Sequence, residues 1–134
     1  MAGGSLGVAL QWIEDGVVSG AGELVARLDA ASGGRGAGDM PVWFRKAAEA
    51  YAEKQLERDK LASKDQATRE GLTLYLRIAA EHVRRSMPGM KDPDALERAC
   101  TTIETIRRAE AYIDENVNVA LALQQLAASL DRVA

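Results

Sequence analysis

Apolar residues recur every three or four positions along most of the chain, which is the spacing of helices with one buried face. No segment alternates apolar and polar residues with the period of two that marks a strand. The pattern therefore predicts an all-α fold, an antiparallel bundle of five to six helices with short loops. The expected helices cover residues 5–16, 17–31, 39–60, 64–86, 93–117 and 119–133.

Polar N-cap residues mark several of these helix starts. Ser5, Asp39, Asp92 and Asn118 are expected structural caps, because their side-chain oxygens can accept a hydrogen bond from an unpaired N–H of the first turn. A proline follows Asp39 and Asp92 within two residues, where the first helical turn tolerates it. The stretch "SKD" at 63–65 offers a further break and cap, and the glycine-rich residues 32–39 are expected to form a flexible loop.

Three apolar stripes are expected to build the core, each with the spacing of one helix face. Trp12, Trp43 and Tyr75 are also expected to pack there rather than to anchor an interface. The stripes are Leu72, Tyr75, Leu76, Ala79 and Val83; Leu96, Ala99, Ile103, Ile106, Glu110, Ile113 and Val117; and Val119, Leu123, Leu126, Leu130 and Val133.

Length and composition restrict the class of protein. The chain of 134 residues fits one domain, and its 47% apolar and 28% charged residues are typical of a globular protein. A formal net charge of -3 and a pI of about 5.2 disfavour autonomous binding to nucleic acid. The single Cys100 cannot form an internal disulfide, and no apolar run is long enough for a membrane span. We therefore expect a soluble, cytoplasmic protein.

No arrangement of residues predicts catalysis, a cofactor or a metal. His82 is the only histidine and has no partner spacing for a metal site, so we expect it at a helix surface or core edge. Cys100 follows Ala99, and we expect it to be a small buried residue. Residues 33–39 contain glycines but lack the lysine and hydroxyl residue of a phosphate-binding loop. The paired arginines and the charged residues 45–60 are expected to lie on solvated helix faces.

The stretch "NVNVALALQQLAASL", residues 116–130, resembles the last helix of bacterial DNA polymerase III clamp-loader subunits, in which the pattern N-x-N-P-x-L-x-L-E precedes further leucines. This resemblance implies that the helix closes a C-terminal collar domain. The matching positions are Asn116, Asn118, Leu121 and Leu123, and the departures are Val119 in place of proline and Gln124 in place of glutamate.

The opening "GGSLGVAL" is similar to the end of the family's AAA+ lid, where a G-S-x-x-x-A-L run begins the helix that carries the sensor-2 arginine. Gly7 occupies the position of that arginine, which favours the non-hydrolysing delta-prime subunit over the gamma/tau motor subunit. The resemblance implies that residues 1–16 are the end of the lid and its connecting helix, and that residues 17–134 are the collar domain. It also implies a nucleotide-binding module in a longer parent protein.

The resemblance implies an assembly function. The domain would pack against the C-terminal domains of other clamp-loader subunits and support the ring that loads the sliding clamp, without binding nucleic acid, membrane, metal or ATP itself. An unrelated helical regulatory or peptide-binding module, with its site in an apolar groove, remains the alternative. The candidate subunit interface consists of Leu121, Leu123, Ala128 and Leu130.

Overall fold

The computed structural model describes residues 16–30, 40–115, 121–126 and 128, and this part of the chain contains helices and connections but no strand. The all-α prediction is therefore confirmed for these residues, and the predicted helix over 5–16 lies outside them. The helices of these residues are α2 (Val17–Ala30), α3 (Met40–Arg58), α4 (Lys64–Ser86), the 3-10 turn η2 (Met87–Gly89) and α5 (Pro93–Asp114). They are followed by residues 121–126 and 128, which are helical and which we name the closing segment.

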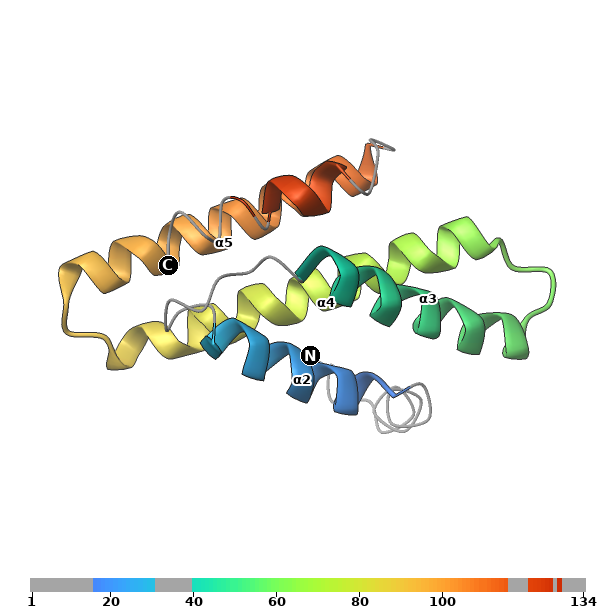
Figure 1. Cartoon of the computed structure of the whole chain (residues 1–134), viewed down its shortest axis with the longest axis horizontal. Helices are drawn as coiled ribbons and strands as arrows, with labels where there is room; N and C mark the ends of the chain where they lie inside the picture. Colours follow the sequence, from blue (N-terminus) through green and yellow to red (C-terminus); the bar gives the residue numbers. More distant parts are fainter. Residues whose placement is uncertain (1–15, 31–39, 116–120, 127, 129–134) are drawn as a thin grey trace.

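The longest helix, α4, is the centre of the bundle (Figure 1). It packs against α3, α5 and α2, and α2 also touches α3. Consecutive helices run in opposite directions, as predicted, and the closing segment returns along α5 (Figure 1). The closing segment therefore packs as a further helix of the bundle, and its Leu123 and Leu126 share the core with residues of α4 and α5.

Two of the predicted helix caps are present. The Asp92 side chain accepts a hydrogen bond from the Asp94 N–H at 3.1 Å, with Pro93 in the first turn of α5. The Ser63 hydroxyl oxygen accepts one from the Gln66 N–H at 3.2 Å and starts α4. Each contact satisfies a backbone donor that has no partner within its own helix. The other three predicted caps, Ser5, Asp39 and Asn118, lie outside the described residues, as do Gly7 and the glycine-rich loop.

An aromatic cluster connects α2, α3 and α4. Trp43 packs edge-on against both Phe44 and Tyr75, with ring centroids 5.4 Å apart in each pair. The indole N–H of Trp43 donates to a carboxylate oxygen of Glu23 at 3.0 Å, which satisfies the polar atom of a buried ring. Trp43 and Tyr75 are thus core residues, as predicted, whereas Trp12 lies outside the described part of the chain.

Glycine allows α4 to approach its neighbours closely. A Cβ atom added to Gly71 would lie 3.1 Å from the Cα of Ala48 on α3, and one added to Gly20 of α2 would lie 2.5 Å from the Tyr75 hydroxyl oxygen. Both distances are shorter than ordinary van der Waals contact, and Ala48 and Tyr75 are buried. The spacing of α2 and α3 from α4 therefore depends on these two positions.

The apolar stripes supply most of the core. Every described member of the predicted stripes is buried except Val83, Leu96, Ile103 and Glu110, which are partly exposed. Leu123 and Leu126 of the closing segment are 1% and 2% exposed and belong to the same core as Ile106 and Ile113. The closing segment is thus integrated in the bundle through one of its faces.

Candidate interaction surface

A groove of about 300 Å³ lies between α5 and the closing segment. We name it the closing groove. One wall is formed by α5, whose lining residues are three or four positions apart and therefore lie on one face of the helix. The closing segment forms the other wall. The lining residues are Thr105, Arg108, Ala109, Tyr112, Ala122, Gln125, Leu126 and Ala128.

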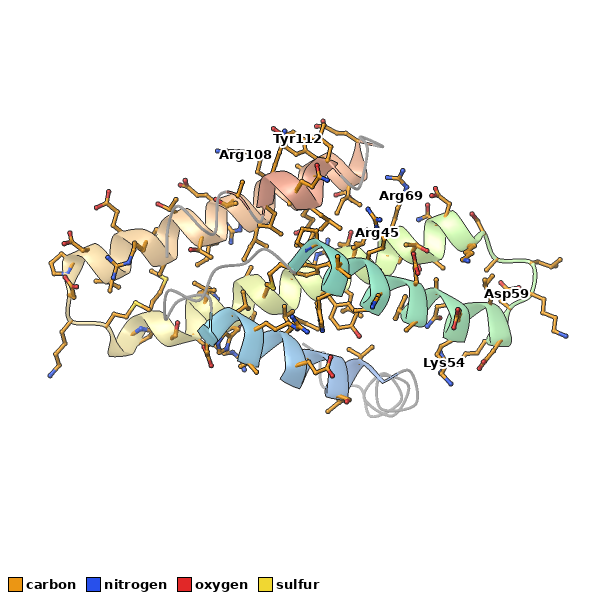
Figure 2. All side chains as sticks on the ribbon, viewed as in Figure 1. Arg45, Lys54, Asp59, Arg69, Arg108 and Tyr112 are labelled. Atoms are coloured by element: carbon orange, nitrogen blue, oxygen red, sulfur yellow. The ribbon has the colours of Figure 1, made fainter. Side chains whose placement is uncertain are left out.

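The closing groove has an apolar floor and a rim of hydrogen-bond donors. Ala109, Ala122 and Leu126 are buried, and no carboxylate is among the lining residues that the structure describes. Figure 2 shows Arg108 and Tyr112 on the outer edge of α5, beside the closing segment. Within the described part of the chain, neither of these side chains nor Gln125 has a hydrogen-bonding or ionic partner. The groove therefore offers guanidinium, phenol and amide groups to a molecule outside the chain.

The four predicted interface residues have different surroundings. The Leu121 side chain is 47% exposed, and Ala128 is exposed at the edge of the closing groove. Leu123 is only 1% exposed, so it is a core residue and is not accessible to a neighbouring subunit. The physical reason is the helical period: Leu121 and Leu123 are two positions apart, which places them about 200° apart around the helix. Leu130 lies outside the described residues.

A second groove, of about 420 Å³, lies between α4 and the last turns of α5. We name it the polar groove, because most of its lining side chains are charged or carry hydrogen-bonding groups. The lining residues are Gln66, Arg69, Glu70, Thr73, Leu74, Arg77, Ile113 and Asp114.

Both arginines of the polar groove have partners within the fold. Arg69 donates from Nη1 to the backbone oxygen of Ile113 at 2.9 Å and from Nε to Asp65 at 3.1 Å. Arg77 Nε lies 2.8 Å from an Oε1 atom of Glu110 on α5. Because the last carbonyls of a helix have no partner within it, the Arg69 contact caps the C-terminus of α5 with a positive charge. The contacts with Ile113 and Glu110 attach α5 to α4.

The arginine pair at the end of α4 is also occupied. Arg84 and Arg85 each donate from Nε to Glu81, at 2.9 Å in both cases. The hydrogen bonds from Arg84 and then Arg85 lower the pKa of Glu81 from 4.5 to about 2. This carboxylate is therefore ionised near neutral pH, and the two arginines are exposed residues held by their own helix.

The remaining candidate residues do not form a catalytic group. His82 Nε2 lies 3.1 Å from Asp29 Oδ1 and connects the surfaces of α4 and α2, in agreement with the predicted core-edge position. Cys100 is exposed, so its predicted burial is wrong. It follows buried Ala99 by one residue, and one residue turns an α-helix by about 100°, away from the core. No three His, Cys, Asp or Glu side chains come together as a metal site among the residues described.

The sequence did not indicate Arg108, Tyr112 and Gln125 as site residues. Arg108 and Tyr112 are four positions apart on α5 and lie off its apolar stripe, which is all that the sequence could have shown. Gln125 joins them only because the closing segment folds back on this side of α5. A groove between two helices depends on how the helices pack, and neither helix by itself carries a signal for it.

No family model, curated protein or solved structure matches the chain. None of the helices in the described ranges is long and apolar enough to cross a membrane.

Proposed function

We propose that the chain is an assembly domain that holds a larger complex together through its closing segment. The observation that supports this is that the segment is apolar on two sides. Ala122, Leu123 and Leu126 are buried against the bundle, whereas Leu121 and Ala128 are exposed. A helix with apolar residues outside its core face gains stability when a neighbour covers them.

The complex that we propose is the ring of a bacterial DNA polymerase III clamp loader. The support is the resemblance of residues 116–130 to the family's closing helix, together with the lid-like opening in which Gly7 replaces the sensor-2 arginine. An all-α bundle with an exposed apolar edge suits a collar, in which each subunit uses different surfaces toward its two neighbours. In this role the domain supports ring assembly, and the proposed parent modules handle nucleotide and clamp.

The closing groove favours one alternative, a helical peptide-binding module. Its apolar floor and donor-bearing rim are the features of a groove that accepts an amphipathic helix. A peptide-binding module would use this one concave site for a range of ligands. A collar domain would bind the C-terminal domains of sister subunits and no others.

Size-exclusion chromatography tests the proposal. The chain is mixed with the C-terminal domains of the gamma/tau and delta clamp-loader subunits of the same organism, and co-elution is measured for the unchanged chain, Leu121→Glu and Ala128→Glu. We expect co-elution that both substitutions weaken, because each places a charge in the proposed contact. Leu61→Glu is the matched control, since Leu61 is 97% exposed in the connection between α3 and α4.

Two results would reject the clamp-loader assignment. One is the absence of co-elution with either sister domain at micromolar concentration. The other is co-elution that Leu61→Glu weakens as much as Ala128→Glu does, because the contact would then not depend on the closing segment. Circular dichroism of each variant shows whether the helical fold is retained.

A further inference from the structure

We propose that the closing groove binds an amphipathic helix of a partner protein, and that a carboxylate on this helix pairs with Arg108. The inference rests on the proposed function in one respect, namely that the closing segment is an assembly surface. It adds the chemistry of the partner: small apolar side chains toward the groove floor and an acidic side chain at the rim.

The shape of the surface favours a helix as the occupant. The groove runs between two helical walls, α5 and the closing segment, and its floor includes the small side chains of Ala109 and Ala122. Small residues let another helix approach closely. Exposed Leu121 and Ala128 lie on the same segment, one before and one after Gln125, so this segment presents apolar side chains over about two helical turns. A partner helix can cover such a length, whereas a small molecule sits within one concave pocket.

The charge of the rim favours an acidic partner. Among the described residues that line the closing groove, Arg108 is the only charged one, and it has no ionic partner in the same ranges. Tyr112 and Gln125 present further donors on either wall. A carboxylate can accept from several donors at once, and its bonds to a guanidinium are among the stronger hydrogen bonds in proteins. The polar groove shows the contrast, because both of its arginines already bind acceptors on this chain.

The same charge disfavours a second copy of this chain as the occupant. A symmetric dimer through the closing groove would place both Arg108 side chains in one interface, and the described lining residues would supply no carboxylate to pair with either. Like charges that approach in an interface oppose association. A different protein that supplies a carboxylate avoids this repulsion.

Two synthetic helical peptides provide the probe. Both are capped 18-residue helices with an Ala/Leu face, and they differ only at one central position beside that face, which is Glu in one and Lys in the other. Fluorescence anisotropy measures their binding to the intact chain. We expect the Glu peptide to bind at least about tenfold more tightly, and its affinity to fall as salt is added.

Charge reversal on the protein locates the contact. Arg108→Glu should abolish the preference for the Glu peptide and favour the Lys peptide instead. Arg107→Glu is the matched control: it makes the same change of charge at an adjacent exposed position that does not line the groove, and it should leave the preference in place. Ala128→Glu should weaken the binding of both peptides, because it places a charge at the edge of the groove itself.

Several outcomes would overturn the inference. Two concern the unchanged chain: equal affinity for the two peptides, and no binding of the Glu peptide up to about 1 mM. Two concern the variants: equal effects of Arg107→Glu and Arg108→Glu on the peptide preference, and a dimer of the chain that Ala128→Glu dissociates. Co-elution with sister subunits that Ala128→Glu weakens and Arg108→Glu leaves unchanged also overturns it, while the proposed function stands. Binding of the Glu peptide without co-elution rejects the clamp-loader assignment and supports the groove.

Discussion

The two grooves beside α5 use arginine in opposite ways. In the polar groove Arg69 binds the backbone oxygen of Ile113 and Arg77 binds the Glu110 carboxylate, and these two contacts connect α4 with α5. In the closing groove Arg108 binds no described residue and lies beside buried alanine and leucine. A guanidinium with internal acceptors contributes to the fold, whereas one without them beside an apolar floor is available for recognition. The difference separates a structural groove from a candidate binding groove.

The largest expected effect concerns the core that supports both grooves. Ile106 of α5 is 1% exposed and packs in the main cluster. Ile106→Ala should lower the free energy of unfolding by about 2–5 kcal/mol, because it removes buried methyl groups and leaves a cavity. Urea denaturation followed by circular dichroism measures the change. Ile103→Ala, at a partly exposed position on the same helix, is the control and should lower the free energy of unfolding by less. An unchanged midpoint for Ile106→Ala would contradict the described core.

The next prediction compares the arginines directly. Arg69→Ala should lower the free energy of unfolding by about 1.5–3 kcal/mol, because it removes a charged hydrogen bond to the last turn of α5. Arg108→Ala should change it by less than about 0.5 kcal/mol, since no internal contact is lost. Thermal denaturation of the two variants under identical conditions gives the comparison. If Arg108→Ala destabilises the chain as much as Arg69→Ala does, the two grooves do not differ as described.

A smaller effect is expected for the exposed ion pair of the polar groove. The Arg77 side chain is 69% exposed, and pairs of this kind contribute about 0.2–1 kcal/mol. Glu110→Gln should therefore reduce stability only slightly, and added salt should remove the difference from the unchanged chain. Arg77→Ala combined with Glu110→Gln isolates the pair in a double-mutant cycle. A coupling free energy between Arg77 and Glu110 well above about 1 kcal/mol would show that this pair, rather than Arg69, is the main attachment of α5 to α4.

The smallest expected effect on stability near neutral pH concerns Glu81, whose pKa is lowered to about 2 by Arg84 and Arg85. A carboxyl whose folded pKa lies below its unfolded value stabilises the fold fully above about pH 4.5, and this contribution is lost as the pH falls toward 2. Stability near neutral pH should therefore not respond to Glu81. Carbon-detected NMR titration should find the lowered pKa, and Arg84→Ala should raise it. A Glu81 that titrates at its ordinary pKa would show that these arginines are not bound to it in solution.

Much of the fold was predictable because its signals are local. The breaks at 63–65 and 87–93 and the cap at Asp92 depend on residues a few positions apart, and the structure confirms them. The stripe through Ala99, Ile106 and Ile113 required only the helical period. The burial of Cys100 was predicted wrongly because adjacency to Ala99 was given more weight than the rotation between neighbouring helical residues.

The candidate site was predictable only in part. Leu121 and Ala128 were expected at a surface and are exposed, whereas Leu123, proposed for the same interface, is buried. The pattern shows that the closing helix has apolar residues on more than one side. It does not show which side meets the bundle, because that depends on how the segment returns along α5.

By itself, then, the sequence determined the helical class, the places where most described helices begin and end, and the residues available for a core. These follow from hydrogen bonding and periodicity within single segments. The tertiary structure alone decided that Arg69 reaches the end of α5, across 44 residues of sequence, while Arg108 lies beside the closing segment without an acceptor. Two arginines look alike in a sequence, because what distinguishes them is the distance to groups on other helices, and packing sets that distance.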